Sequence, residues 1–338
     1  MTCPCRQSPS GGSFTFAGKQ IKGKMKNNIV LWSVMSELGA GTRGASLGWQ
    51  AMRMASLQYA PTLFKRYPQR EVPADNEALF GPSGDPRALY LTGISQMYQR
   101  IEERLQASLE SGHFPLVLAG DHSNAGGTIA ALKKALLGQR LGVIWVDAHA
   151  DLHSPYTSPS GNVHGMPLAT ALGEDNRAHA VGEPSAETEE QWQQMKGEGP
   201  RLQPQDLVFI GVRSAEAAEK ALLEQYAIPN FTVDQLRVEG AQTIAQKARQ
   251  HLSGCDVLYL SFDVDSLDPR VSVGTGTPVE NGFTEAEATE LLLHLTKDER
   301  LRAFELVEVN PLLDRNGNSM AEAAVRILEE VSRKIEGI

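Results

Sequence analysis

LGVIWVDAHAD, residues Leu141–Asp151, is the stretch that decides the fold of this chain. Its first six residues are apolar apart from one glycine, and such a short run is typical of a buried parallel strand. Residues two apart on an extended chain point to the same side, so Asp147, His149 and Asp151 can face a common point beyond the strand. The stretch therefore predicts a core strand that delivers two carboxylates and an imidazole to one edge of a sheet.

Two more segments repeat this arrangement of an apolar strand followed by possible ligands. Phe114–Ala119 precedes Gly120-Asp121-His122-Ser123, and Val257–Phe262 precedes Asp263-Val264-Asp265. The carboxyl ends of parallel strands meet at one edge of an open α/β sheet, where ligands usually bind. A single Asp-x-Asp after a strand is more often a turn or a helix cap, but three such segments together favour a ligand site.

The ligand types indicate what such a site would hold. Carboxylates and imidazoles, without a cysteine, suit a pair of hard divalent cations, and hydrolases use two-metal sites of this kind. A two-metal phosphoesterase would share these ligands but would be expected to add Arg or Lys clamps for phosphate. Here an acid, Glu308, follows the last strand instead. The pattern therefore disfavours an anionic substrate.

The rest of the chain alternates between strand-like and helix-like segments without an internal repeat, which predicts an α/β fold. We expect three α/β/α layers around a mostly parallel eight-stranded sheet. Strands are predicted at 28–34, 114–119, 141–146, 207–210, 229–232, 257–262 and 302–307, and helices at 47–59, 85–111, 187–195, 216–226, 244–252, 285–294 and 321–335. The long second helix is predicted to begin at Asp85-Pro86 and to stop at Gly112. The polar segment 175–204 is expected to be a surface excursion.

Composition limits the class of protein further. With 338 residues and a hydrophobic fraction of 41%, we expect a flexible N-terminal leader at 1–27 and one domain at 28–338. The net charge of −9 argues against a nucleic-acid partner and suits a cationic substrate. The chain has no long uninterrupted apolar run and no secretory h-region, so we expect no membrane partner and a cytoplasmic location. Cys3, Cys5 and Cys255 do not suggest a disulfide framework.

Six motifs then occur in an order that matches a known family. They are 119–123 (AGDHS), 147–151 (DAHAD), 160–167 (SGNVHGMP), 261–269 (SFDVDSLDP), 276–278 (GTP) and 308–311 (EVNP). Together they resemble the arginase branch of the ureohydrolases, a family that also contains agmatinases and formimidoylglutamases. The resemblance implies a binuclear-metal hydrolase that cleaves the guanidinium of L-arginine to L-ornithine and urea by a metal-bridging hydroxide.

The resemblance also assigns the metal ligands. Asp147 and Asp263 would bridge two ions, His122 and Asp151 would complete one coordination shell, and His149 and Asp265 would complete the other. The family implies two Mn(II) ions, although the ligand types alone would also suit nickel, cobalt or iron. Asp151 would in addition accept a hydrogen bond from the hydroxide and orient it towards the substrate carbon.

Three residues match the family's contacts around the guanidinium. Glu308 would accept two parallel hydrogen bonds from this planar cation, for which a carboxylate is the matched acceptor. His164 matches the histidine that passes a proton to the departing amine, and Thr277 matches a residue near the guanidinium. Without the resemblance, they would be interpreted as a capping acid, an exposed loop histidine and a turn threonine.

The residues around the amino-acid end of the substrate decide specificity. Ser158, Ser160 and Asn162 match the arginase loop that holds the α-carboxylate, and Glu219 matches a family acid. Two positions depart from the family: His153 stands where arginases have asparagine, and Glu216 where they have the aspartate that contacts the α-amino group.

The loop motif Ser-Gly-Asn-x-His-Gly favours arginine as the substrate over agmatine. Agmatine or a guanidino acid is the alternative, because both departures concern the amino-acid end. A non-catalytic metal-binding relative fits less well, since such a protein should have lost ligands and all six are present. The resemblance further implies a homo-oligomer, either a trimer or a hexamer.

Overall fold

One eight-stranded sheet runs through the computed structural model, which describes residues 28–337. All strands are parallel, in the order β2-β1-β3-β8-β7-β4-β5-β6. They are β1 (Ile29–Val34), β2 (Gln69–Glu71), β3 (Phe114–Ala119), β4 (Leu141–Val146), β5 (Leu207–Ile210), β6 (Asn230–Phe231), β7 (Val257–Asp263) and β8 (Leu301–Val307). The expected leader at 1–27, with Cys3 and Cys5, lies outside the described residues.

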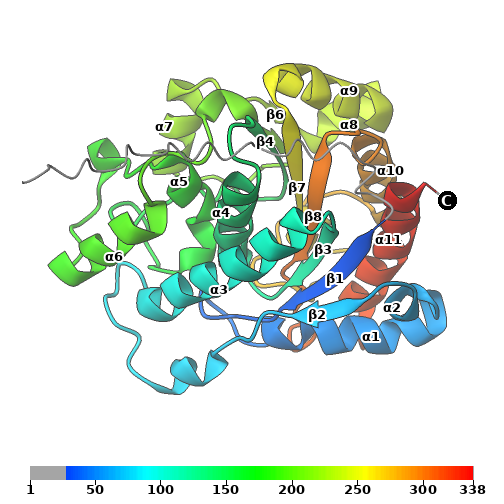
Figure 1. Cartoon of the computed structure of the whole chain (residues 1–338), viewed down its shortest axis with the longest axis horizontal. Helices are drawn as coiled ribbons and strands as arrows, with labels where there is room; N and C mark the ends of the chain where they lie inside the picture. The colour runs from blue at the N-terminus through cyan, green and yellow to red at the C-terminus, as the bar shows by residue number, and fades with distance from the viewer. Residues whose placement is uncertain (1–27, 338) are drawn as a thin grey trace, which may run out of the picture.

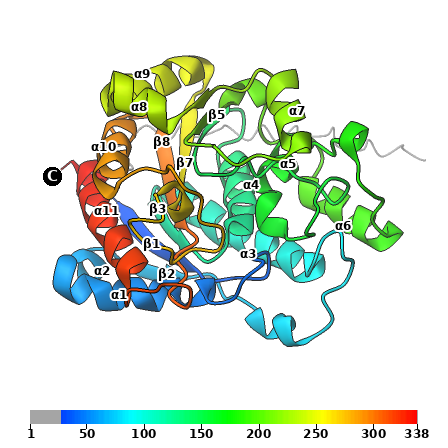
Figure 2. The same ribbon diagram turned by 180° about the vertical axis from the view of Figure 1, so that it is seen from behind.

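Helices cover both faces of this sheet, which confirms the predicted three-layer α/β/α fold (Figures 1 and 2). One face packs against α1 (Gly48–Tyr59), α2 (Leu63–Arg66), α8 (Val233–Glu239), α9 (Ala241–His251), α10 (Glu285–Leu295) and α11 (Ser319–Glu336). The other packs against α3 (Leu91–Glu110), α4 (Ala125–Ala135), α5 (Pro167–Leu172), α6 (Ala186–Lys196) and α7 (Ala217–Gln225). No described helix is long and apolar enough to cross a membrane.

Strand β4 shows why the sheet forms from continuous apolar runs. All six of its residues are buried, because helices lie on both sides. Val143 and Trp145 belong to the core on the α4 side, whereas Ile144 and Val146 belong to the core on the α10 side. Burying each large apolar side chain contributes roughly 1.5–3 kcal/mol. The strand is therefore anchored on both faces, and the residues that follow it are held in place.

The long helix α3 begins six residues later than its sequence signals suggested. It starts at Leu91, because Tyr90 before it has φ 56°, in the left-handed region, and cannot continue a helix. Asp85 instead accepts hydrogen bonds from the backbone N–H groups of Arg87 at 2.9 Å and Ser185 at 2.6 Å. The Asp-Pro pair therefore caps a turn that joins two loops, and its prediction as a helix start was wrong.

Two other expectations need correction. Strand β2 escaped prediction because Gln69, Arg70 and Glu71 are all exposed and carry no apolar alternation; only pairing with β1 makes them a strand. The segment 175–204 is more than a surface excursion. Its helix α6 buries Trp192 completely, and the indole N–H donates a 2.8 Å hydrogen bond to Asp175. The helix predicted at 187–195 is confirmed as Ala186–Lys196, but the polar composition concealed its buried anchor.

Candidate active site

The three segments that carry the possible ligands meet at the carboxyl edge of the four central strands. His122 lies in the turn between β3 and α4, Asp147 directly follows β4, and Asp263 is the last residue of β7. Strands β3, β8, β7 and β4 are neighbours in that order. The prediction that the possible ligands share one edge of the sheet is confirmed.

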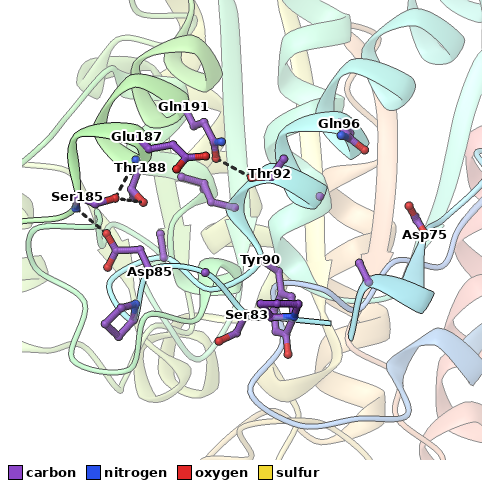
Figure 3. A pocket seen from close by; sticks show the side chains of 17 residues that line it. Asp75, Ser83, Asp85, Tyr90, Thr92, Gln96, Ser185, Glu187, Thr188 and Gln191 are labelled. Carbon is purple, nitrogen blue, oxygen red and sulfur yellow. Dashed lines mark hydrogen bonds between the residues drawn. The ribbon is translucent and has the colours of Figure 1, made fainter. Parts of the chain in front are cut away.

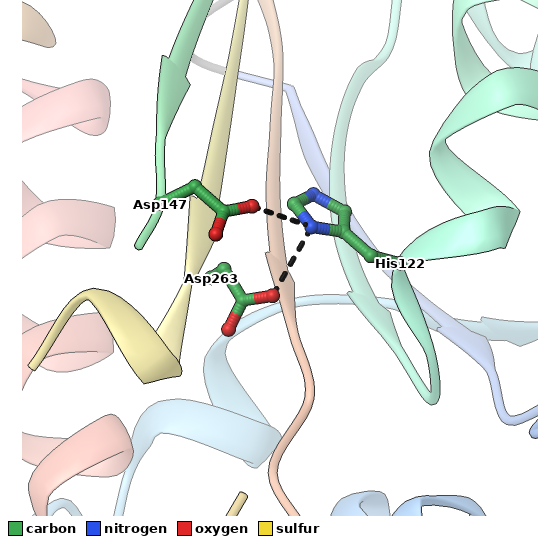
Figure 4. A group of neighbouring side chains, drawn as sticks. All are labelled: His122, Asp147 and Asp263. Atoms are coloured by element: carbon green, nitrogen blue, oxygen red, sulfur yellow. Dashed lines mark ion pairs between the residues drawn. The ribbon is translucent and has the colours of Figure 1, made fainter. Parts of the chain in front are cut away.

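One group of side chains converges on the ring of His122. Its Nδ1 atom lies 3.0 Å from Asp147 Oδ2 and 3.1 Å from both Asp151 Oδ2 and Asp263 Oδ2. Figure 4 shows this nitrogen pointing at the carboxylates of Asp147 and Asp263. All four residues are buried. Three acidic oxygens therefore surround a single nitrogen that is almost fully buried.

A second group forms around His149 and shares Asp147 with the first. His149 Nδ1 lies 2.9 Å from Asp265 Oδ2 and 3.6 Å from Asp147 Oδ1. The ligand atoms of these three residues lie within 4.8 Å of one another, as do those of His122, Asp147 and Asp263. Asp147 belongs to both groups, which is the position of a bridging ligand. Asp263 belongs only to the group around His122.

The chemistry of this donor set fits divalent cations. His122 Nδ1 and Asp147 Oδ2 are buried and complete no hydrogen bond with any described residue, although they face each other. Burial and the neighbouring Asp265 and Asp147 raise the pKa of Asp263 well above its usual range. Burying this many acids is costly unless positive charge accompanies them. Two groups of hard ligands with a shared carboxylate are suited to a pair of ions.

Nearby side chains fix the orientation of the His122 ring. The ring stacks on Trp145 with 4.0 Å between the centroids and 6° between the planes. On the side away from the carboxylates, Nε2 lies 2.8 Å from Ser261 Oγ. Neither Trp145 nor Ser261 was predicted as a site residue. Strand alternation could have indicated Ser261, which lies two residues before Asp263 and so faces the same side of β7.

Glu308 and His164 lie beside the first group. Glu308 Oε1 accepts a 2.9 Å hydrogen bond from the backbone N–H of His122 and lies 3.5 Å from His164 Nδ1. Burial lowers the pKa of His164, but Glu308, with smaller effects from Asp151 and Asp121, raises it to about 9. The imidazole therefore carries a proton at neutral pH, next to the carboxylate.

The backbone is strained at two of these residues. Asp151 has φ 50° and Glu308 has φ 69°, a region that residues with a β-carbon rarely adopt. Asp151 is the last residue of its motif, and Glu308 directly follows β8 and begins its motif. Such conformations persist only where the surroundings enforce them, and they cluster at functional sites.

Above the two groups lies a pocket of about 290 Å³. Its lining includes most of the residues predicted to contact substrate, namely His153, Ser158, Ser160, Asn162, His164, Glu216, Glu219 and Thr277. The two predicted site residues that do not line the pocket contact lining side chains: Asp147 contacts His122, and Glu308 contacts His164. The fold thus brings the predicted residues together around one cavity.

Three of the residues predicted to contact substrate also form hydrogen bonds within the protein. Thr277 Oγ1 donates a 3.1 Å hydrogen bond to Asp265 Oδ2, so it supports a predicted ligand. Ser158 and Ser160 accept hydrogen bonds from the backbone N–H groups of Gly161 at 2.9 Å and Asn162 at 3.2 Å. The two hydroxyl groups therefore also shape their own loop.

The two positions that depart from the family meet in space. His153 Nε2 lies 3.5 Å from Glu216 Oε2 and 3.6 Å from Glu219 Oε2. Glu219 is buried and accepts a 3.1 Å hydrogen bond from the Leu152 N–H, whereas the Glu216 side chain is 58% exposed. Glu216 is the more accessible acid, and His153 links the two carboxylates.

A larger pocket of about 730 Å³ lies elsewhere, between the start of α3 and the start of α6 (Figure 3). Some of its polar side chains are bonded to each other, for example Thr92 to Gln191 at 3.0 Å and Ser185 to Thr188 at 3.0 Å. It contains none of the predicted ligands. Size alone therefore does not mark the reactive site.

The fold and the shared carboxylate define an α/β protein with a candidate binuclear metal centre. A family model described as "Arginase family" matches residues 27–332, and the chain belongs to the arginase family. It is 34% identical to the arginase of Bacillus caldovelox, over 89% of this chain and 96% of that relative. The arginase of Bacillus subtilis is 32% identical, over 92% of this chain and 99% of that relative.

Solved structures agree with this assignment. The native structure of the Bacillus caldovelox arginase has a TM-score of 0.77 and 34% identity, covering 90% of this chain and 98% of that chain. The Entamoeba histolytica arginase in complex with L-ornithine has a TM-score of 0.78 over 90% of this chain and 98% of that chain, but 23% identity, and supports the fold alone. The protein is a hydrolase of the arginase family.

Proposed function

We propose that this protein hydrolyses L-arginine to L-ornithine and urea in the pocket above the two ligand groups. The observation that carries the proposal is the shared Asp147, which joins a His122 group to a His149 group within a member of the arginase family. His122, Asp151, Asp147 and Asp263 would hold one ion, and His149, Asp265 and the shared Asp147 would hold the other. The family resemblance implies that Asp263 would also be shared. When bound, two such ions supply positive charge and lower the pKa of a water molecule towards neutrality.

The remaining steps belong to the chain's own residues. The buried carboxylate of Glu308 receives the guanidinium, whose planar donors match two carboxylate oxygens. Asp151 accepts a hydrogen bond from the attacking water and orients it. His164, protonated at neutral pH, donates its proton to the departing amine nitrogen, and Glu308 beside it keeps that proton in place. Thr277 supports Asp265.

At the far end of the pocket, we assign the α-amino group to Glu216, with Glu219 and His153 behind it. Ser158, Ser160 and Asn162 face the α-carboxylate. Agmatine, which has no α-carboxylate, is the second candidate. It is favoured by the two acids at this end and by the use of both serine hydroxyls inside the loop. We propose Mn(II) as the metal, because carboxylate and imidazole ligands suit it. Cytoplasmic location and homo-oligomeric assembly stay predictions.

A substrate panel tests the proposal. Protein loaded with Mn(II) is incubated separately with arginine, agmatine, guanidinobutyrate and formimidoylglutamate, and urea, ornithine, formamide and ammonia are measured. We expect urea and ornithine in equal amounts from arginine, with the largest kcat/KM of the panel. Faster urea release from agmatine than from arginine would identify agmatine as the substrate instead. No product from any of the four would contradict the proposed reaction.

A further inference from the structure

A line of buried polar side chains runs from the ring of His122 into the core, away from the pocket. Ser261, Tyr259 and Glu305 have no exposed surface, although they lie in the middle of the sheet. Tyr259 and Ser261 are two residues apart on β7 and share the face from which Asp263 reaches the candidate metal centre. Glu305 is the cross-strand partner of Ser261 on β8. Burying a carboxyl group and a phenol in the middle of a sheet costs free energy, which their contacts must offset.

Hydrogen bonds connect these groups in series. His122 Nε2 lies 2.8 Å from Ser261 Oγ, and the Tyr259 hydroxyl donates a 2.8 Å hydrogen bond to Glu305 Oε2. Ser261 and Tyr259 join the two halves, because they lie two residues apart on one face of β7 and the Ser261 side chain lowers the pKa of Tyr259. The relay His122, Ser261, Tyr259 and Glu305 is therefore continuous from the candidate metal centre to a buried carboxyl group.

The acceptor at the end gives this relay a direction. An ionised carboxylate accepts hydrogen bonds and donates none, so Tyr259 directs its proton to Glu305. The Tyr259 oxygen is then free to accept from Ser261, and the Ser261 oxygen to accept from His122 Nε2. Burial raises the pKa of Glu305, and the hydrogen bond that its Oε2 accepts from Tyr259 opposes that rise. In this direction the imidazole proton sits on Nε2.

We propose that Tyr259 and Glu305 are positioning residues that hold His122 in the tautomer able to bind a metal ion through Nδ1. The inference rests on the proposed role of His122 as a metal ligand. Nδ1 faces the carboxylates and offers a lone pair only if the proton is on Nε2. Trp145 fixes the plane of the ring, and the relay fixes its proton. Partners of this outer kind typically change metal affinity about ten- to a hundredfold.

The experiment measures the dissociation constants of the two Mn(II) ions by chelator competition at one pH. Tyr259→Phe removes the relay's central hydroxyl, and Glu305→Gln keeps the side chain's size but supplies an amide donor that can reverse the relay. We expect each variant to bind one ion about ten- to a hundredfold more weakly and the other nearly as wild type. Tyr98→Phe is the matched control, because its hydroxyl is also buried but lies on α3 and takes no part in the relay.

Circular dichroism and thermal unfolding of the metal-free proteins establish that each variant is folded. If Tyr259→Phe does not fold, Glu305→Gln and Ser261→Ala carry the test, since neither adds volume. Wild-type affinity for both ions in the folded variants would overturn the inference, as would an equal loss in Tyr98→Phe. Wild-type protein that fails to bind two ions would instead contradict the proposed function. The binding measurement needs no substrate, so the two failures are distinguishable.

Discussion

The backbone N–H of His122 donates a 2.9 Å hydrogen bond to Glu308 Oε1, so a proposed metal ligand and the proposed guanidinium acceptor are directly joined. The Glu308 N–H in turn donates to the Gly120 carbonyl at 2.9 Å. Both contacts cross from β8 to the turn after β3. The carboxylate is therefore held at a fixed place relative to the ligands before substrate arrives, which is the preorganisation that catalysis requires.

Glu308→Gln should lower kcat/KM for arginine while leaving the metal content unchanged. The amide keeps an oxygen for the His122 N–H but loses the charge that pairs with guanidinium, a loss of about 1.5–3 kcal/mol, or about ten- to a hundredfold. Steady-state kinetics and elemental analysis measure both quantities. Glu299→Gln, at an exposed position, is the control. Unchanged kinetics would remove Glu308 from the site.

Asp263→Asn should lower both the metal content per chain and the turnover rate. The neutral amide is a weaker bridge, and we expect less than two ions per chain and more than about a hundredfold loss of turnover. Elemental analysis after gel filtration gives the stoichiometry. Asp234→Asn, whose side chain is 93% exposed, should retain both ions. Full metal content in Asp263→Asn would contradict its placement as a ligand.

His164→Ala should bind both ions but slow turnover about 10²- to 10⁴-fold, because the departing amine loses its proton donor. Added imidazole should restore part of the rate. Since the pKa of His164 is raised to about 9, wild-type turnover should fall as pH rises through that value, and this fall should be absent in the variant. His251→Ala, at an exposed site, is the control. Normal activity without imidazole would exclude the proton transfer.

Glu216→Gln should reduce kcat/KM for arginine about fivefold, a modest effect because the carboxylate is largely exposed. An arginine analogue that lacks the α-amino group should be hydrolysed by the variant as well as by wild type. The glutamine oxygen still caps α7, so stability should be retained. Glu224→Gln, exposed on the same helix, is the control. Equal losses for both substrates would exclude contact with the α-amino group.

Metal binding should release protons and weaken as pH falls. Burial lowers the pKa of both histidines, but the neighbouring carboxylates outweigh it. Asp265 and Asp147 raise the pKa of His149 to about 12. Asp147, Asp151 and Asp263 raise the pKa of His122. Both imidazoles are therefore protonated in metal-free protein at neutral pH, and an ion must displace those protons. Calorimetry in two buffers of different ionisation enthalpy counts the protons. Affinity that does not change between about pH 6 and 8 would contradict this linkage.

The fold could be predicted because buried parallel strands leave a clear mark in sequence. Phe114–Ala119 and Leu141–Val146 are continuous apolar runs, and the predicted bounds of both strands are confirmed. The edge strand Gln69–Glu71 has no such mark, because it depends on pairing with β1. The start of α3 could not be placed either, since the left-handed Tyr90 is imposed by contacts between loops.

The site could be predicted only in part, for a similar reason. The possible ligands were recognisable because strand alternation and motif spacing are local properties. The contacts that orient them are not local: Ser261 reaches His122 from another strand, and Asp121 Oδ2 accepts a 2.9 Å hydrogen bond from the Gly39 N–H. Gly39 has no room for a side chain there, since a β-carbon would lie 2.6 Å from Ser123 Oγ. Such packing appears only in three dimensions.

Anomalous diffraction from crystals loaded with Mn(II) tests the central claim most directly. Data collected near the manganese edge locate each ion without reference to activity. We predict two peaks that share Asp147 and Asp263, one beside His122 and Asp151 and the other beside His149 and Asp265. A single peak, or peaks away from these six side chains, would contradict the binuclear centre on which the proposed hydrolysis of arginine depends.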